Sequence, residues 1–353
     1  MAHLPQTYTA ALFEGPGQPL RLVERALPPL GEGETLVRVV AATLCASDLH
    51  SFHGRRSAPV PSVLGHEVMG EVLATRAAKV TPGQRITWSM VVACGTCERC
   101  QRGIPQKCER LFKYGHEAVE DGRAPSGGFA DLLVLRAGTP VFPVPAELPA
   151  TLAATANCAG ATVAAVLRVA GLSSASEGAG KRVLVLGAGM LGLTACAMAH
   201  GFGAQVCLYD PDPQRAEKAI ALGARVLEAG ELAQDKFAAF DAALEFSGHP
   251  DAFALGLRAL GIGGRLVLAG AVYPTPPASA DMERIVRRLL RIEGVHNYRP
   301  ADLATALDFL AQAHSRYPLA ALVEKEFPLS AINEAFAYAT NARPVRVAIV
   351  AAK

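Results

Sequence analysis

The sequence has little net charge, and it lacks both an export signal at its start and an uninterrupted apolar run. The formal net charge is +2 over 353 residues, which gives no electrostatic reason to expect nucleic acid or an anionic membrane as a partner. Residues 1–15 hold neither a basic nor a continuous apolar segment, unlike a secretory signal. We therefore expect a cytoplasmic protein whose partners are small molecules or copies of itself.

One stretch without charged residues resembles a membrane span at first sight. Residues 183–209 contain no Asp, Glu, Lys or Arg, and long uncharged runs are typical of such spans. Glycines and polar residues interrupt this run at the places where a turn would separate a strand from a helix. We therefore predict a buried β-α-β unit here and no membrane contact.

The chain is long for a single hydrophobic core, so two domains are expected. Its first part is rich in Gly and Pro, with short β-like runs at 35–40 and 131–135, a pattern that favours an antiparallel β domain. From about Cys158, Ala-rich helical patterns alternate with short apolar strands, which indicates a parallel, doubly wound sheet. The strands expected there cover 183–186, 205–209, 242–246 and 265–269.

The C-terminal segment, from about residue 298, contains both helical and strand patterns. It holds two helical patterns, 301–314 and 329–341, and a final strand at 345–350. We predict a first domain made of residues 1–158 and 298–353, and a second domain made of residues 159–297.

Four cysteines lie within a short segment, spaced C-x2-C-x2-C-x7-C. The spacing lets one loop wrap four thiolates tetrahedrally around a metal ion, as a closed structural zinc site requires. An iron–sulfur cluster fits less well, because the bacterial ferredoxin run has three residues before its last cysteine and a proline after it. Here seven residues precede that cysteine and Glu109 follows it. The predicted structural zinc ligands are Cys94, Cys97, Cys100 and Cys108.

A glycine-rich turn follows the apolar run 182–186 and leads into an apolar helical pattern. Such a G-x-G-x-x-G sequence between a strand and a helix is a dinucleotide-binding fingerprint. Its glycines permit a tight turn, close approach of a pyrophosphate and close helix packing, and the free N–H groups of the helix start attract the anion. The predicted cofactor-binding residues of this turn are Gly187, Gly189, Met190, Leu191 and Gly192.

An acidic residue, Asp210, ends the next predicted strand. A carboxylate at that position accepts hydrogen bonds from ribose hydroxyls and repels a 2′-phosphate, so NAD is favoured over NADP. Arg215 lies five residues further on, and an arginine there can accommodate the phosphate. The alternative for Asp210 is a simple turn residue before Pro211.

Two shorter segments carry a second constellation, Cys-Ala-Ser-Asp-Leu-His from Cys45 and Gly-His-Glu around His66. Each alone is unremarkable, since a buried cysteine usually fills core volume. Together with the glycine motif and the cysteine cluster, they resemble the zinc-dependent medium-chain dehydrogenase/reductase (alcohol dehydrogenase) family. The resemblance implies a GroES-like β domain, a Rossmann domain and two zinc ions per chain. It implies that Cys45, His66 and Cys158 bind a catalytic zinc and leave one position open.

The same resemblance implies an NAD-dependent alcohol oxidation and roles for further residues. Ser47 would hydrogen-bond the substrate oxygen, and His50 would pass its proton to solvent. Glu67 would support the catalytic zinc or ligate it transiently. Thr162 would contact the nicotinamide and Arg346 the pyrophosphate. The alternatives are a surface-loop histidine for His50 and a salt-bridged carboxylate for Glu67.

Four further stretches, 87–90, 103–108, 112–117 and 294–298, resemble a bacterial subgroup, the phosphonate catabolism-associated alcohol dehydrogenases. The cyclitol dehydrogenases are relatives of that subgroup. A cyclitol or other polyol needs neutral hydrogen-bonding groups, for which Asp48, Ser89, His116, Glu117 and Asn297 are available. A hydroxyphosphonate needs cations, and the choice includes Lys113, His116, Arg287, Arg288, Arg291 and His296. The sequence does not decide between them. The residues expected to line the substrate pocket are Phe52, Trp88, Met90, Phe112 and Tyr114.

Two other classes of protein share parts of this pattern. A non-catalytic, zinc-stabilised dinucleotide-binding protein would be expected to lack one of the residues Ser47, Cys45, His66 and Cys158, and all are present. A zinc-free quinone reductase of the medium-chain type would lack both the catalytic zinc ligands and the cysteine cluster. An exposed strand edge near 265–271 favours self-association as a homodimer or homotetramer.

Overall fold

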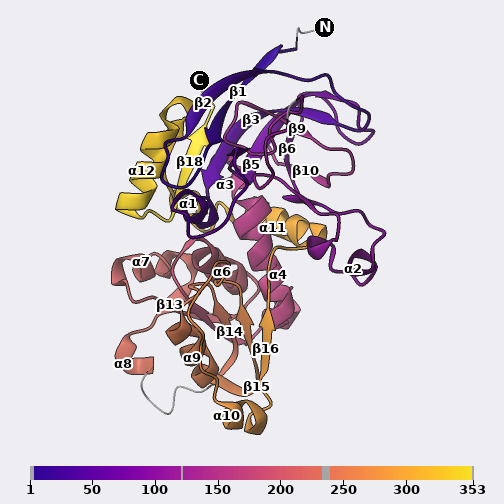
Figure 1. Cartoon of the computed structure of the whole chain (residues 1–353). Coiled ribbons are helices and arrows are strands. Elements are labelled where there is room, and N and C mark those ends of the chain that lie inside the picture. The colour runs from indigo at the N-terminus through magenta and orange to yellow at the C-terminus, as the bar shows by residue number, and fades with distance from the viewer. Residues whose placement is uncertain (1–3, 121, 233–238, 352–353) are drawn as a thin grey trace. The chain divides into compact units, whose positions relative to one another are not determined.

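A computed structural model describes residues 4–120, 122–232 and 239–351. The chain divides into two compact units, one formed by Met1–Cys158 with Ala320–Lys353 and the other by Ala159–Leu319. Figure 1 gives the elements of both units. Each unit has its own sheet system, so the predicted combination of an antiparallel β domain and a parallel doubly wound domain is confirmed.

The first unit is built mainly from antiparallel strands. Within its described residues, one seven-stranded sheet has the order β10-β6-β5-β3-β18-β17 with β9 also paired to β3, and smaller sheets have the orders β2-β1-β4 and β7-β8. The strands are β1 (Thr7–Phe13), β2 (Arg21–Ala26), β3 (Thr35–Leu44), β4 (Ser62–Val63), β5 (Glu67–Thr75), β6 (Arg85–Trp88), β7 (Val91–Val92), β8 (Phe112–Lys113), β9 (Leu132–Leu135), β10 (Val141–Pro143), β17 (Val323–Pro328) and β18 (Arg346–Val350). The helices are α1 (Ala46–Phe52), α2 (Glu98–Gln101), α3 (Ala150–Ala154) and α12 (Ile332–Ala342).

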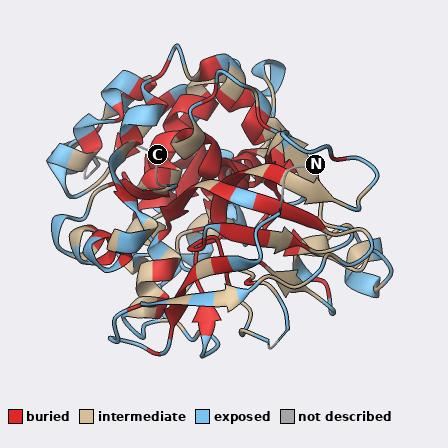
Figure 2. Cartoon of the chain, turned by 90° about the horizontal axis from the view of Figure 1, so that it is seen from above, coloured by how far each residue is buried: buried red, intermediate tan, exposed pale blue. Residues whose placement is uncertain are grey.

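The core of this unit lies between the large sheet and the elements that cover it. Trp88, Phe129 and Phe336 are among its largest fully buried side chains, and Figure 2 shows buried residues concentrated along the strands. The long strand β3 is buried at almost every position and pairs with β5, β9 and β18. Such a strand holds the residues at its end in fixed positions.

The second unit is a parallel sheet with helices on both faces. Within its described residues the strand order is β13-β12-β11-β14-β15-β16. The strands are β11 (Arg182–Leu186), β12 (Gln205–Tyr209), β13 (Ala224–Val226), β14 (Phe240–Glu245), β15 (Leu260–Leu268) and β16 (Arg291–Gly294). The helices are α4 (Ala161–Ala170), α5 (Ala175–Gly178), α6 (Met190–Gly201), α7 (Pro213–Glu217), α8 (Ala229–Leu232), α9 (Pro250–Ala259), α10 (Met282–Arg287) and α11 (Pro300–Ala313).

The alternation of β11 shows why both faces of this sheet are covered. Leu184 and Leu186 belong to the apolar cluster that α9 completes, whereas Val185 lies beneath Gly192 of α6 on the other face. A strand buried on both faces reads as a continuous apolar run. The run 183–209 is accordingly the buried β-α-β unit that the sequence predicts.

The second boundary between the units differs from the predicted one. The chain returns to the first unit at Ala320, not at residue 298. The helix α11 packs against α4, and Arg168 binds Asp302 through Nε–Oδ1 at 2.7 Å and Nη2–Oδ2 at 3.1 Å. This pairing spans 134 positions of sequence, so no local pattern in the tail reveals it.

The edge of the parallel sheet also differs from the expected one. Residues 265–268 of the expected edge lie on β15, which pairs on both sides. The edge strand beyond it is β16, and all four of its residues are exposed.

One helical stretch of the described residues has the length and hydropathy of a membrane span. It covers residues 150–170, and 78% of its most apolar window is buried inside the protein. Burial of that extent is what a core helix shows.

Removing the carboxylate that joins α11 to α4 should destabilise the second unit. We expect Asp302→Ala to lower the free energy of unfolding by about 2 kcal/mol, a value reduced from that of a fully buried pair because the Arg168 side chain is 34% exposed. Urea denaturation measures it. The control Asp308→Ala removes an exposed carboxylate from the same helix and should change the value by less than about 0.5 kcal/mol. Equal effects of the two substitutions on the free energy of unfolding would contradict the view that the Arg168–Asp302 pair stabilises this unit.

Candidate metal and cofactor sites

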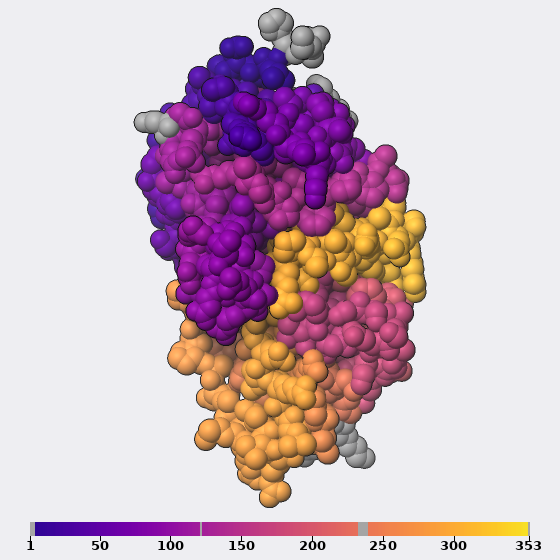
Figure 3. All heavy atoms as spheres, turned by 90° about the vertical axis from the view of Figure 1, so that its right-hand side faces the viewer, coloured from indigo at the N-terminus to yellow at the C-terminus, as the bar shows by residue number. Residues whose placement is uncertain are grey.

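The four clustered cysteines of the first unit converge as predicted. Their sulfur atoms lie within 4.8 Å of one another, on the segment that α2 and the short 3-10 turn η1 (Pro105–Lys107) fold back on itself. In the space-filling view of Figure 3, this purple part of the chain protrudes from the surface of its unit. We call it the cysteine lobe, residues 94–110.

Backbone N–H groups of the cysteine lobe point at the sulfur atoms. Cys94 and Arg110 donate to Cys108 Sγ, and Cys97 donates to Cys94 Sγ, each at 3.3 Å. Hydrogen bonds from Thr96 lower the pKa of Cys94 to about 5, since a donor favours the thiolate. Four soft donors in this arrangement fit a closed tetrahedral zinc site.

A second cluster in the same unit joins three distant parts of the chain. Side-chain donor atoms of Cys45, His66 and Cys158 lie within 4.8 Å of one another. Cys45 follows β3 and caps α1, and His66 precedes β5. Cys158 lies on a π-helical turn, η2 (Ala156–Gly160), a rare geometry that often occurs at functional sites.

Buried polar side chains hold these three donors in place. Asp48 accepts the Cys45 N–H through Oδ2 at 2.9 Å, and its Oδ1 lies 3.3 Å from His66 Nδ1. Asn157 accepts the Val68 N–H at 3.2 Å and donates to the Trp88 carbonyl at 3.1 Å, which ties the turn of Cys158 to β5 and β6. Carboxylates behind a ligating histidine are typical of zinc sites.

The three donors influence one another's protonation. Burial opposes the charged form of His66, but Asp48 and Cys45 outweigh it and raise the pKa of His66 to about 10. A hydrogen bond with Cys158 lowers the pKa of Cys45 well below its ordinary value, and raises that of Cys158. Among the residues that the structure describes, two sulfurs and one imidazole form this group without a fourth donor, which fits a zinc site with an open position.

Beneath this cluster lies an ion pair of which both members are almost completely buried. Glu67 Oε1 lies 3.3 Å from Arg346 Nη2, and Thr43 donates a hydrogen bond to Glu67. Burial raises the pKa of Glu67 to about 7, although Arg346 opposes the shift. Arg346 also donates to the Leu44 carbonyl at 2.8 Å. The salt-bridge reading of Glu67 is confirmed, and the predicted contact of Arg346 with a pyrophosphate stays a prediction.

Ser47 and His50 lie on α1, directly after Cys45. Ser47 Oγ is 3.4 Å from His66 Nε2, so this hydroxyl lies at the metal cluster. His50 is half-buried, and burial together with Arg55 lowers its pKa. Side chains three positions apart share one face of a helix, which puts His50 on the side of Ser47.

The glycine turn of the second unit leads from β11 into α6 as predicted. Gly187 has φ = 104°, which favours glycine. A Cβ on Gly192 would lie 1.8 Å from the Gly187 carbonyl oxygen, whereas a Cβ on Gly189 would meet nothing nearer than Arg215 Nη2 at 3.9 Å. The space beside Gly189 is therefore open to a ligand, and the first N–H groups of α6, at Met190 and Leu191, face no intrahelical partner.

A cavity of about 680 Å³ lies beside this turn. Its lining includes Gly187, Asp210 and His249. Asp210 accepts the N–H groups of Ala188 at 2.6 Å and Asp212 at 2.9 Å, so its carboxylate is fixed at the cavity wall. The size and lining fit the adenosine part of a dinucleotide. Thr162 lies on α4, and its contact with a nicotinamide stays a prediction.

Several residues expected in the substrate pocket serve the protein interior instead. Trp88 and Tyr114 are fully buried and meet edge to face with ring centroids 6.1 Å apart. Phe52 packs against Phe336 at 4.9 Å. Met90 is 2% exposed. Aromatic residues near a site usually fill core volume.

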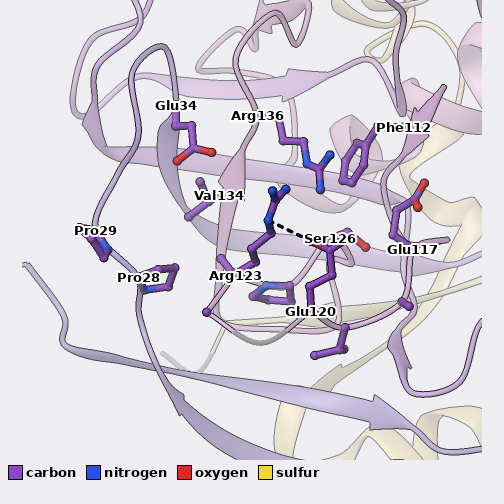
Figure 4. A pocket seen from close by; sticks show the side chains of 15 residues that line it. Pro28, Pro29, Glu34, Phe112, Glu117, Glu120, Arg123, Ser126, Val134 and Arg136 are labelled. Carbon is purple, nitrogen blue, oxygen red and sulfur yellow. Dashed lines mark ion pairs between the residues drawn. The ribbon is translucent and has the colours of Figure 1, made fainter. Parts of the chain in front are cut away.

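Phe112 lines a different cavity, of about 190 Å³ (Figure 4). The Arg136 guanidinium stacks on its ring at 3.7 Å from the centroid. Glu117 lines the same cavity, and its part in binding a polyol stays a prediction. Asp48 and Ser89 are buried and bonded to the backbone, Ser89 through the Val91 carbonyl at 2.9 Å.

The basic residues expected to hold a phosphonate separate into two groups. Arg287 pairs with Glu283 on α10, and both side chains are 77% exposed. Arg288 donates to the Leu260 carbonyl at 2.7 Å, and Arg291 is exposed. Lys113 and His116, in contrast, lie in the unit of the metal clusters, and the His116 ring is 5.0 Å from that of His66. Sequence reasoning missed Arg56, which interacts electrostatically with both.

Comparison with known proteins follows the same division. The alcohol dehydrogenase GroES-like domain matches residues 31–146, and the zinc-binding dehydrogenase model matches residues 191–312. The chain is 28% identical to the L-threonine 3-dehydrogenase of Pectobacterium atrosepticum over 298 residues, which cover 80% of this chain and 77% of the relative.

Solved structures agree over the full length. An alcohol dehydrogenase from Thermotoga maritima matches with a TM-score of 0.89 and 25% identity, over 98% of this chain and 100% of that one. The alcohol dehydrogenase of Thermus sp. ATN1 matches with a TM-score of 0.85 and 27% identity, with the same coverage.

Zinc titration of the chelator-stripped protein should release protons. At pH 7 the raised pKa values keep His66 and Cys158 protonated, and both must lose a proton to bind zinc, so loading this cluster should release at least about two protons. Because the pKa of His66 lies near 10, the affinity should rise as pH increases from about 6 to 9. Calorimetry in buffers of different ionisation enthalpy measures both effects.

Substitutions assign the two metal equivalents. Cys45→Ser should remove one of the two and Cys97→Ser the other, while the control Cys207→Ser, a thiol outside both clusters, should keep both. Full zinc content in Cys45→Ser would show that the cluster is not a metal site.

Proposed function

Because the chain belongs to the zinc-type medium-chain dehydrogenase/reductase family, we propose that it is a zinc-dependent alcohol dehydrogenase that oxidises a primary or secondary alcohol and transfers hydride to NAD. The carrying observation is the difference between the two clusters of the first unit. The cysteine lobe offers four donors, whereas Cys45, His66 and Cys158 offer three. A three-donor zinc site keeps a position for substrate, as catalysis needs.

The residues around the three-donor cluster suit proton removal from an alcohol. Zinc, when bound there, supplies Lewis acidity. Ser47 holds the hydroxyl of the substrate through a hydrogen bond, since its Oγ lies 3.4 Å from His66 Nε2 and therefore beside the metal position. His50, with its lowered pKa, is neutral near pH 7 and can accept the proton and pass it to solvent. Glu67 supports the cluster from below as the partner of Arg346.

The cofactor assignment rests on Asp210. Its carboxylate lines the cavity beside the glycine turn and would repel a 2′-phosphate. Arg215, near Gly189, can bind the pyrophosphate instead, so both residues are compatible with NAD. The cysteine clusters fit a reducing, cytoplasmic location, and the exposed strand β16 offers an edge for a homodimer or homotetramer.

The substrate class follows from the groups that reach the three-donor cluster. His116 donates a hydrogen bond from Nδ1 to the Tyr114 carbonyl at 2.9 Å. Its Nε2 can then accept a hydrogen bond from a hydroxyl of a polyol or cyclitol. The second candidate is a hydroxyphosphonate, favoured by Lys113. A non-catalytic dinucleotide-binding protein is the third reading, and an NAD-linked screen over polyols, cyclitols, hydroxyphosphonates and simple alcohols distinguishes all three.

Replacing Asp210 should change the cofactor preference. We expect Asp210→Ala to lower the ratio of kcat/KM for NAD to that for NADP by about 100-fold, because both a ribose hydrogen bond and a repulsion are lost. The control Asp212→Ala removes the neighbouring carboxylate, which caps α7 through Gln214 and Arg215, and should leave the ratio within about threefold. An unchanged ratio in Asp210→Ala would remove this residue from the cofactor site.

Replacing His50 should affect the pH dependence of oxidation. We expect His50→Gln to lower kcat at pH 7 by about 10- to 100-fold and to abolish the acid limb of the pH profile. That limb should lie below the ordinary pKa of histidine, since burial lowers the pKa of His50. His53→Gln is the matched control, because His53 is exposed and bonds Thr340 at 3.1 Å. Identical profiles for wild type and His50→Gln would exclude the relay.

A further inference from the structure

The two residues of β8 face different surroundings. Phe112 lies under Arg136 in the cavity of Figure 4. Lys113 interacts electrostatically with Cys45 and Cys158, which are donors of the metal cluster. Successive side chains of a strand point to opposite faces, so the short strand presents a lysine to the metal cluster and a phenylalanine away from it.

Lys113 lacks a carboxylate partner within the described part of the chain. Glu117 accepts the backbone N–H of Lys113 at 2.8 Å and lines the cavity of Figure 4. Among the residues that the structure describes, no carboxylate forms an ion pair with the Lys113 ammonium. The opposite charges that act on its ammonium are the thiolates of Cys45 and Cys158, which a bound zinc would neutralise. A partly buried ammonium without a carboxylate partner is costly and often marks a functional site.

A second cation faces the same region. Arg56 is half-buried on the segment after α1, where its backbone N–H bonds the His50 carbonyl at 3.2 Å. Within the described ranges it also forms no ion pair, and it interacts electrostatically with Lys113 and His116. Two cations that share one region and lack a carboxylate partner repel each other, and a bound anion would relieve that repulsion.

We propose that Lys113 and Arg56 form an anion subsite beside Cys45, His66 and Cys158, so that the alcohol oxidised there carries a carboxylate or phosphonate group. This inference rests on the proposed alcohol oxidation and narrows its substrate class. Arg287 and Arg288 do not compete for the role, because Arg287 is paired with Glu283 and Arg288 donates to the Leu260 carbonyl. The neutral acceptor of His116 then faces a hydroxyl of the same substrate, and the cations bind its charged end.

The direct test is equilibrium binding of two probes, methylphosphonate and acetate, to the zinc-loaded protein by calorimetry. The wild type should bind at least one, and the tighter of the two identifies the charged group. Lys113→Met should raise its Kd by about tenfold or more, Arg56→Gln by about three- to tenfold, and Lys113→Arg by less than about threefold because the charge is kept. The control Lys79→Met removes an exposed lysine of the same unit and should leave the Kd unchanged.

Two binding results would overturn the subsite: neither probe binds the wild type, or Lys113→Met binds as tightly as wild type. Arg56→Gln keeps the test decisive if Lys113→Met does not fold, since Arg56 lies at the surface of the region. These results do not depend on turnover.

Turnover separates this inference from the proposed function. The ratio of kcat/KM for 3-hydroxybutyrate or 2-hydroxyethylphosphonate to that for the neutral 2,3-butanediol should fall by about 100-fold in Lys113→Met and stay at the wild-type value in Lys79→Met. Oxidation of neutral alcohols alone contradicts the anion subsite and leaves the dehydrogenase intact. Absence of NAD-linked oxidation across the whole alcohol panel contradicts the proposed function, whatever the binding data show.

Discussion

The antiparallel pairing of β3 with β5 is the interaction on which the metal cluster of the first unit depends. It places Thr43 opposite Glu67, so Cys45 and His66 leave neighbouring strands at the same end of the sheet. Asp48 then bonds the segments of both donors. Since a slip of one residue would turn every side chain to the other face, the pairing that fills the core also sets the donor geometry.

The two metal clusters differ in how the chain builds them. The cysteine lobe is local, and its sulfurs receive N–H groups from within the same loop. The three-donor cluster is assembled from distant segments and is surrounded by buried charge, with Glu67 and Arg346 below it. Isolated buried charges are costly unless they are paired. Within the described residues, Glu67 and Arg346 pair with each other, whereas Lys113 and Arg56 have no carboxylate partner. At the proposed subsite a substrate would supply that partner.

The features that the sequence predicts well are those coded by short spacings. The cysteine cluster, the glycine turn and Asp210 each lie within one segment, and the predicted strands at 183–186 and 205–209 match β11 and β12. The features that sequence reasoning missed depend on distant partners. The return to the first unit at Ala320 follows from the pairing of Arg168 with Asp302. Phe112 and Lys113 are adjacent in sequence, and only the pairing of β8 with β7 decides that their side chains face different surroundings.

The central claim is that one metal cluster is closed and the other open. Visible absorption of the cobalt-substituted protein tests it most directly, because cobalt bands report the number and type of ligands at each site. We expect two tetrahedral thiolate–cobalt spectra, of which only the one lost in Cys45→Ser shifts when an alcohol substrate is added. A single cobalt spectrum, or a substrate-induced shift that persists in Cys45→Ser, would contradict this account.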